Sequence, residues 1–438
     1  MTEENPAEGF DPKDFAKFLQ ELLGGNGNIN AEELARVAGL PNDPKVIEAL
    51  LKQLQSAIIQ GDSQTVDGVN WTVAKQQAIS SAHEGSQAVG EGAKTAVLEA
   101  SRIATLWLDQ ATALSSLANE PKLLTREVWV QDALPLFQQL SGPIATRVAA
   151  SLTENLEQNL PSELEGLAQG AGGIMRSAGG ALFAMQFGSA LGKLSHEVLT
   201  GGDIGLPFYA DSRAAFVPQN LNQFIANNEL PEDQAYIYLS VREQAHARLF
   251  RHSRWLRESA ISQLTNYAKE IHIDGETLSE LASEISSENA EALKRALESG
   301  ALLAERTDEQ LVALSSIETL LALVEGWVEV VTESATKLLP TSQTLHEVLR
   351  RRRATSSPAQ ATFATLVGLE LTPRKSREAA QFWRALTEKL GVEKRDAVWD
   401  HPDLLPTAAD IENVDGYIAR ISQGEDQIDQ ALRDLLGE

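Results

Sequence analysis

Apolar residues recur every three or four positions along most of the chain, the spacing that places them on one face of an α-helix. The segment DPKDFAKFLQELL shows this clearly, with Phe15, Leu19 and Leu22 on a common face. Further helical segments follow, separated by GGNGN and QGDSQTVDG, whose composition is typical of joints between elements. We therefore expect residues 1–65 to form a small helical appendage and residues 66–438 to form the main domain.

The clearest departure from the helical spacing is LPFYADSRAAFVP, residues 206–218. Its aromatic and β-branched residues predict one or two short strands. Breaks between helices are expected at residues 119–121 and 142–143, because each of these short segments contains a proline, which interrupts helical hydrogen bonding. The whole pattern predicts a fold that is mainly α-helical with a few short strands.

A glycine-rich stretch at residues 166–203 contains Gly180, Ala184, Gly188 and Gly192, which are spaced four apart. On a helix they form one smooth stripe that lets another helix approach closely. A membrane-inserting hairpin is the alternative, but an arginine and a lysine bracket the stretch too closely for a span. We favour a tightly packed core helix.

Composition narrows the possible functions. A net charge of −25 over 438 residues argues against nucleic acid as the main partner, because nucleic acid binds clustered positive charge. The absence of cysteine excludes disulfides, thiolate catalysis and cysteine-ligated metal sites. The start of the chain lacks the apolar core of a secretory signal, and no uncharged apolar run reaches the ~18 residues of a membrane span. We expect an acidic, cytoplasmic, bacterial protein without a transmembrane segment.

One local exception to the acidic balance is the arginine run at residues 350–353. Such a run can mark a nucleic-acid surface, or it can lie as a solvated basic face. In a chain with this excess of acidic residues, we expect one or more of these arginines to pair with carboxylates instead.

The candidate chemistry lies in the helical segment YLSVREQAHARLF. Leu239, Glu243, His246 and Phe250 share one face of this helix, and Arg242 lies at its edge. Residues 242–246 read R-E-x-x-H, one residue away from H-E-x-x-H, the motif of zinc-protease helices. Arginine cannot replace the first ligand, because its guanidinium stays protonated and has no lone pair to offer.

A second helix also interrupts its apolar face with a charge. Thr307 and Gln310 form the T-x-x-Q pattern of a capping box, and the helix is expected to run to Leu339 before Pro340. Within it, Glu325 breaks an apolar stripe in LLALVEGWVEVV. A carboxylate on a buried face needs a cation or several hydrogen-bond donors, so Glu325 must have a partner.

Together the two helices contain most of a zinc-protease site. In such a site two histidines and a downstream glutamate hold the metal, and the glutamate after the first histidine is the general base. Glu243 fits the base, His246 the second ligand and Glu325 the third. The plainer interpretation is that Glu243 and His246 form a satisfied polar pair in a core, since R-E-x-x-H often occurs by chance.

Other histidines do not complete a standard site. His83, His196 and His346 each begin an H-E pair, but none has a second histidine four residues later. His252 and His401 remain as distant candidate ligands. The chain also lacks a G-x-S-x-G elbow, a P-loop and a dinucleotide-binding glycine motif.

Several segments together resemble a bacterial family that is described as zinc-dependent metalloproteases or hydrolases with a zincin-like fold. The resemblance covers residues 66–421 and rests on DGVNWTVAKQQA, MQFGSALGKLSHEVL, YLSVREQAHARLFRHSRWLR, LLALVEGWVEVV, LRRRRA, LVGLELTPRKSREAAQFW and RDAVWDHPDLLPTAADI. It implies a minimal gluzincin-type helical core and a metallopeptidase activity. The Arg242 form of the motif places this chain in a branch that departs from the zinc-competent pattern.

Two functions follow. In the first, the protein is a catalytically degenerate zincin-like scaffold that binds another protein, which could be membrane-associated, and no metal is expected. Arg242 then points into the former metal site and pairs with Glu325 or Glu243. In the second, the protein is a zinc-dependent metallohydrolase that uses Glu243, His246, Glu325 and a further ligand.

Overall fold

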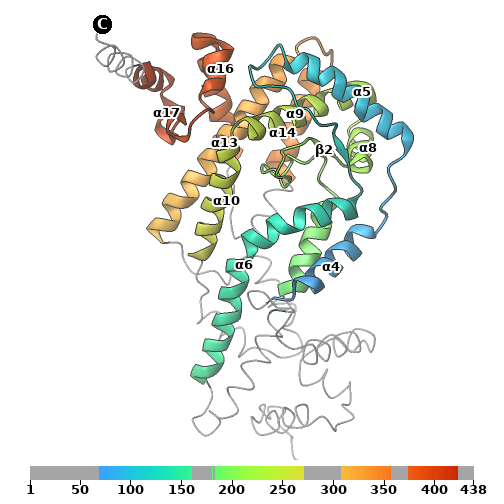
Figure 1. Cartoon of the computed structure of the whole chain (residues 1–438), viewed down its shortest axis with the longest axis vertical. Helices are drawn as coiled ribbons and strands as arrows, with labels where there is room; N and C mark the ends of the chain where they lie inside the picture. Colours follow the sequence, from blue (N-terminus) through green and yellow to red (C-terminus); the bar gives the residue numbers. More distant parts are fainter. Residues whose placement is uncertain (1–68, 160–179, 181–182, 271–306, 357–372, 423–438) are drawn as a thin grey trace, which may run out of the picture. The chain divides into compact units, whose positions relative to one another are not determined.

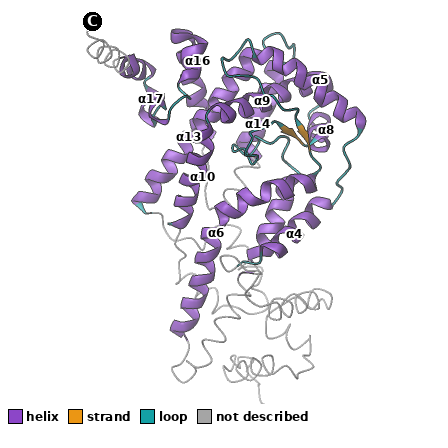
Figure 2. Cartoon of the chain, in the orientation of Figure 1, coloured by secondary structure: helices purple, strands orange, loops and turns teal. Residues whose placement is uncertain are grey.

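The computed structural model describes residues 69–159, 180, 183–270, 307–356 and 373–422 (Figure 1). The predicted appendage at residues 1–65 lies outside this part of the chain. Helices predominate in the described residues, and two short strands accompany them (Figure 2). The expectation of a mainly helical fold with few strands is confirmed.

The helices are α4 (Trp71–His83), α5 (Glu91–Leu108), α6 (Arg126–Asn159), α8 (Pro218–Asn227), α9 (Glu232–His252), α10 (Arg254–Lys269), α13 (Asp308–Ala335), α14 (Ser342–Ser356), α16 (Pro373–Ala397) and α17 (Ala408–Glu412), with a 3₁₀ turn at Pro402–Leu404. Strands β1 (Lys122–Leu123) and β2 (Ala215–Phe216) pair in parallel, and Thr200 forms an antiparallel bridge to Phe216.

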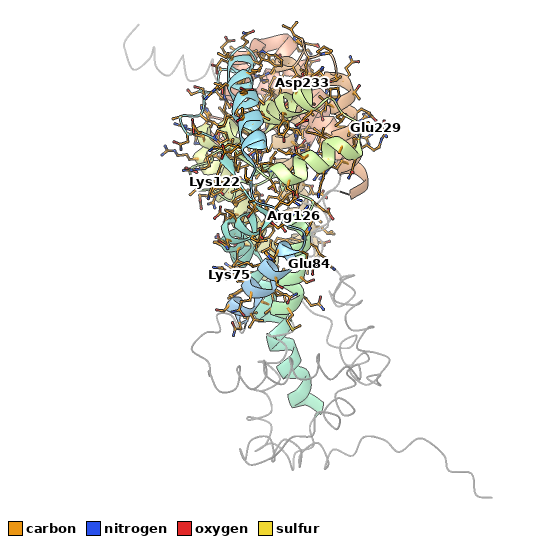
Figure 3. All side chains as sticks on the ribbon, turned by 90° about the vertical axis from the view of Figure 1, so that its right-hand side faces the viewer. Lys75, Glu84, Lys122, Arg126, Glu229 and Asp233 are labelled. Atoms are coloured by element: carbon orange, nitrogen blue, oxygen red, sulfur yellow. The ribbon has the colours of Figure 1, made fainter. Side chains whose placement is uncertain are left out.

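The chain forms two compact units. One comprises residues 1–69, 146–182 and 273–303, and the other comprises 70–145, 183–272 and 304–438. Apart from the part of α6 beyond residue 145, the elements described below belong to the second unit. Lys75, Glu84, Glu229 and Asp233 are exposed on its surface (Figure 3).

Helix α9 is the central element of this unit. It packs against α5, α8, α10, α13 and α14, so it is buried on nearly every side. Acidic residues in its first turn and basic residues in its last turn suit the helix dipole. Two of its inward polar side chains find partners: Gln244 Nε2 donates to the Ser101 carbonyl at 2.7 Å, and Arg248 Nη1 lies 2.7 Å from Asp109 Oδ1. Such contacts help to hold the ionisable residues of a buried helix in a fixed place.

Helix α13 begins with the predicted capping box, in which Thr307 and Gln310 each accept the other's backbone N–H. It ends at Ala335, four residues before the predicted end. Gly326 lets α16 approach, because a Cβ atom there would lie 2.6 Å from the Ala380 nitrogen. Among the described helices α13 alone is long and apolar enough to cross a membrane, but more than half of that stretch is buried inside the fold. It is best explained as a core helix that packs on α9, α10 and α16.

The glycine stripe packs as predicted where the structure describes it. The helical residues 183–195 lie against α4, and a Cβ atom at Gly188 would come within 2.5 Å of the Ala74 carbonyl oxygen. Trp71 completes the contact, with its ring 5.1 Å from that of Phe187. The smooth stripe therefore serves helix packing within the chain.

The predicted helix break at residues 142–143 is wrong. Helix α6 continues through both Pro135 and Pro143. A proline inside a helix removes one backbone hydrogen bond and bends the axis, which a long helix can accommodate. The break at residues 119–121 is present, between α5 and β1, and the segment 206–218 contains the one strand β2.

Candidate functional site

Glu243 extends from α9 toward the loop that precedes β2. Its carboxylate accepts hydrogen bonds from the backbone N–H groups of Gly202 and Ala215, both at 2.9 Å. The residue is only 2% exposed. Burial raises the pKa of the Glu243 carboxyl to about 7, although the two backbone donors oppose this rise. A Cβ atom at Gly202 would lie 3.0 Å from Glu243 Oε2, so the close approach depends on glycine there.

His246 lies one turn further along α9, beside the same loop. Burial lowers the pKa of its imidazole to about 3, so the ring is neutral at pH 7. The Gly205 backbone opposes this lowering of the pKa. Nε2 is buried and has no hydrogen-bond partner among the described residues. Nδ1 faces the loop, since a Cβ atom at Gly202 would lie 2.6 Å from it.

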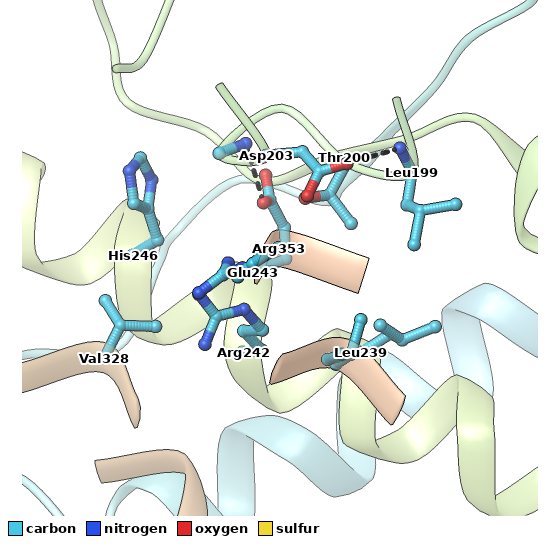
Figure 4. A pocket seen from close by; sticks show the side chains of 11 residues that line it. Leu199, Thr200, Asp203, Leu239, Arg242, Glu243, His246, Val328 and Arg353 are labelled. Carbon is cyan, nitrogen blue, oxygen red and sulfur yellow. Dashed lines mark hydrogen bonds between the residues drawn. The ribbon is translucent and has the colours of Figure 1, made fainter. Parts of the chain in front are cut away.

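Arg242 turns from α9 toward α13. Its Nη2 lies 2.5 Å from Oε1 of Glu325, and the two side chains are 15% and 23% exposed. Arg353 of α14 contacts the same oxygen through Nη1. In Figure 4 the two guanidinium groups lie together, with Asp203 and His246 beside them. The pairing of Arg242 with Glu325 that the sequence predicts is thus present, and Glu325 has a second cation as well.

Asp203, which follows Gly202 in the same loop, is a further point at which the loop is held. Arg352 grips this carboxylate with two hydrogen bonds, at 3.1 and 2.9 Å, and the Leu199 N–H donates to it at 3.0 Å. Burial alone would raise the pKa of Asp203, but the charge and hydrogen bonds of Arg352 outweigh it and hold the pKa below its usual value. The loop is therefore fixed by a buried, ionised carboxylate.

These groups enclose a cavity of about 10 Å³, which is room for about one water molecule. Its polar wall consists of Thr200, Asp203, Arg242, Glu243, His246 and Arg353, and its apolar wall of Leu199, Leu239, Val328 and Leu349 (Figure 4).

Comparison with known proteins places this arrangement in context. The family described as zincin-like metallopeptidase matches residues 69–418. The chain belongs to this family. A crystal structure from Chloroflexus aurantiacus, described as "a putative hydrolase with a novel fold", is similar in fold, with a TM-score of 0.55 and 19% identity over 81% of this chain and 99% of the other. No curated protein matches the chain.

Zincin-like metallopeptidases imply zinc, but the donors here do not fit it. A zinc ion needs neutral or anionic donor atoms with free lone pairs, and catalytic sites take three of them from the protein. Among the described residues that line the cavity, Nε2 of His246 is the one buried side-chain nitrogen or oxygen without a hydrogen-bond partner that could bind a metal. The oxygens of Glu243 accept backbone N–H groups, and Oε1 of Glu325 is taken by guanidinium groups. Two arginines beside the cavity would also repel a dication.

A second cluster, formed by two glutamates of α13 and one histidine of α14, has the ligand types that the first lacks. Atoms of Glu329, Glu333 and His346 that could bind a metal lie within 4.8 Å of one another. However, Arg384 donates to Glu329 at 2.8 Å and to Glu333 at 2.9 Å. One guanidinium group thus contacts both carboxylates and offsets one of their two negative charges.

The distant candidate ligands lie elsewhere. Nε2 of His252 is 2.6 Å from Oδ1 of Asp400, and Nδ1 of His401 accepts the Asp403 N–H at 3.2 Å at the start of the 3₁₀ turn. Neither histidine lines the cavity.

The structure brings Arg242, Glu243 and His246 together at the cavity, and Glu325 is connected to them through its ion pair with Arg242. The sequence does not predict the loop that meets Glu243 and His246. It predicts that arginines of the run at residues 350–353 pair with carboxylates, which is confirmed for Arg352 and Arg353, but it does not predict that Arg353 meets Glu325. The available signals are the glycine pair before Asp203 and the arginine run itself.

Proposed function

We propose that this zincin-like protein is a non-catalytic scaffold that binds another protein in the bacterial cytoplasm. The observation that carries the proposal is the partly buried ion pair between Arg242 and Glu325, the two residues that stand where the sequence pattern predicts the first and third metal ligands. A guanidinium group supplies the positive charge that a zinc ion would otherwise provide for that carboxylate.

The ion pair also has a structural consequence that suits a scaffold. It connects α9 to α13, and Arg353 adds α14 to the same carboxylate. Removing one member of a buried pair is strongly destabilising, so the former site now contributes to the stability of the domain. A cavity of about 10 Å³ leaves no room for a peptide substrate, whereas small-molecule sites are usually hundreds of Å³.

Metal content tests this proposal directly. Purified protein, prepared without chelator, should contain zinc far below one equivalent per chain when measured by inductively coupled plasma mass spectrometry. The matched control is His246→Asn, which should have the same zinc content as wild type. Stoichiometric zinc that disappears in His246→Asn would overturn the proposal.

A genetic test addresses function itself. In a host strain that lacks the gene, His246→Asn should restore the wild-type phenotype as well as the native sequence does, because a scaffold needs the folded domain and not the imidazole. Circular dichroism of the purified variant must first show that it folds. A folded His246→Asn protein that fails to complement would favour catalysis.

A zinc-dependent hydrolase with a non-standard ligand set is the second candidate. One observation favours it: Nε2 of His246 is buried without a hydrogen-bond partner among the described residues, so this nitrogen is available to a metal ion. His246 would then act with Glu243, Glu325 and one further ligand.

A further inference from the structure

Glu325 contacts a second guanidinium group that the motif does not explain. Nη1 of Arg353 meets the same Oε1 atom that Arg242 approaches to 2.5 Å. The two arginines come from different helices, α14 and α9. One cation is enough to neutralise a carboxylate, so the second arginine is not required by charge balance alone.

The position of this second arginine is set by its neighbours on α14. The first two arginines of the run at residues 350–353 pair with Glu347 of the same helix, and their side chains are half or more exposed. The last two turn inward. Arg352 donates to Asp203 through both of its Nη atoms. This contact fixes the rotation of α14 that points the next residue, Arg353, toward the cavity.

Charge around the cavity opposes any metal ion. Burial lowers the pKa of Arg353 well below its usual value, and the nearby charge of Arg242 lowers it further. The same two arginines lower the pKa of His246, after the larger effect of burial. A dication bound to Nε2 of His246 would add to this repulsion. Removing one arginine would leave the other on Glu325, the carboxylate that a metal would need.

We infer that Arg353 is a second, independent block to metal binding, so that restoring histidine at position 242 alone leaves the site unable to bind zinc. Both arginines must be replaced before Glu325 becomes available together with His246 and the new histidine. This inference rests on the proposed function, since it takes the native site to be free of zinc.

The experiment compares zinc uptake by four forms of the full chain, all of which carry His346→Asn to remove the second cluster as a source of bound metal. The reference form, called wild type here, keeps both arginines, and the other three carry Arg242→His, Arg353→Met, or both changes (the double variant). The proteins are stripped with EDTA, dialysed against equimolar zinc chloride and analysed by mass spectrometry. We expect about one zinc per chain in the double variant and close to none in the other three. Adding Glu325→Gln to the double variant is the matched control and should abolish uptake.

The outcomes separate the two proposals. If Arg242→His alone takes up one zinc as tightly as the double variant, Arg353 is no block and the inference fails, while the proposed function stands. If wild type takes up zinc that His246→Asn removes, the proposed function fails too. A double variant that is folded by circular dichroism but free of zinc also overturns the inference. If methionine at 353 prevents folding, Arg353→Gln replaces it, and failure of both to fold assigns Arg353 a structural role instead.

Discussion

Helix α13 carries two groups of carboxylates that meet arginines, and their surroundings differ. Glu325 faces Arg242 and Arg353, which line a cavity of about 10 Å³. Two turns later, Glu333 is 33% exposed beside an open hollow of about 790 Å³, where it meets Arg384 and lies 3.5 Å from His346. We call the first group the sealed group, because its two arginines are only 15% and 23% exposed, and the second the open group, because Arg384 is 38% exposed beside the hollow.

In this molecule the sequence motif and the converging set of metal-ligand residues lie in different groups. The sealed group has the position of the zinc motif, and in the described residues its buried atom without a partner is Nε2 of His246. The open group has no motif, yet two glutamates and a histidine converge there. In both groups arginine contacts the carboxylates, so the difference in burial decides how much each arginine contributes to stability.

The largest expected effect is on the sealed group. Replacing both Arg242 and Arg353 by alanine leaves Glu325 buried without a cation, and we expect a loss of about 3–5 kcal/mol in the free energy of unfolding. Arg242→Ala alone should cost about 1.5–3 kcal/mol, because Arg353 still faces the carboxylate. Arg384→Ala at the open group should cost about 1 kcal/mol or less. Urea denaturation measures all three, and equal costs for Arg242→Ala and Arg384→Ala would remove the distinction between the groups.

The pH dependence of stability is the next test. The folded pKa of His246 is about 3, below the unfolded value near 6.5, so its contribution raises the free energy of unfolding as pH rises from 3 to 6.5. The folded pKa of Glu243 is about 7, above the unfolded value near 4.5, so its contribution lowers that free energy from pH 4.5 to 7. Between pH 4.5 and 6.5 the two slopes oppose each other.

Glu243→Gln removes one slope and should reveal the other. Stability of this variant should rise with pH by about 1.4 kcal/mol per unit more steeply than wild type between pH 4.5 and 6.5. His246→Asn should show the opposite change. Chemical denaturation at several pH values gives both slopes. Identical profiles for wild type and the two variants would show that neither group titrates in this range.

Much of the sealed group could be predicted from the sequence. The helical spacing around Glu243 and Glu325 predicted that both carboxylates point inward, and the cost of burying an unpaired charge predicted the partner of Glu325. These inferences rest on local periodicity and on charge balance, which a single sequence contains.

The rest depends on contacts between distant segments. No local pattern shows that Arg353 reaches Glu325, or that Gly202 and Ala215 donate to Glu243. The open group is equally hidden, because Glu329 and Glu333 come from one helix and His346 from another. The error at Pro143 has a related cause: local propensity favours a break there, and helix α6 continues in spite of it.

The loop beside the sealed group offers a smaller effect. A Cβ atom at Gly202 would lie 2.6 Å from Nδ1 of His246, so Gly202→Ala must displace the ring or the loop. We expect a loss of about 1–3 kcal/mol from overpacking. Gly92→Ala, in α5, is the control, since nothing lies within 4 Å of its Cβ position and the change should be neutral or slightly stabilising. Thermal unfolding compares them, and a wild-type melting temperature for Gly202→Ala would show that the loop yields freely.

The smallest effect on stability is expected at the open group, where it also tests metal binding. His346→Asn should change the free energy of unfolding by less than about 1 kcal/mol, because its contact with Glu333 is partly exposed. Zinc added to wild type should not raise the melting temperature if Arg384 keeps both glutamates occupied. If zinc does stabilise wild type, and His346→Asn abolishes this while His246→Asn does not, the metal-binding group of this zincin-like protein lies two turns along α13 from Glu325. That result would mean that the open group binds the metal, whereas the sealed group serves only the stability of the fold.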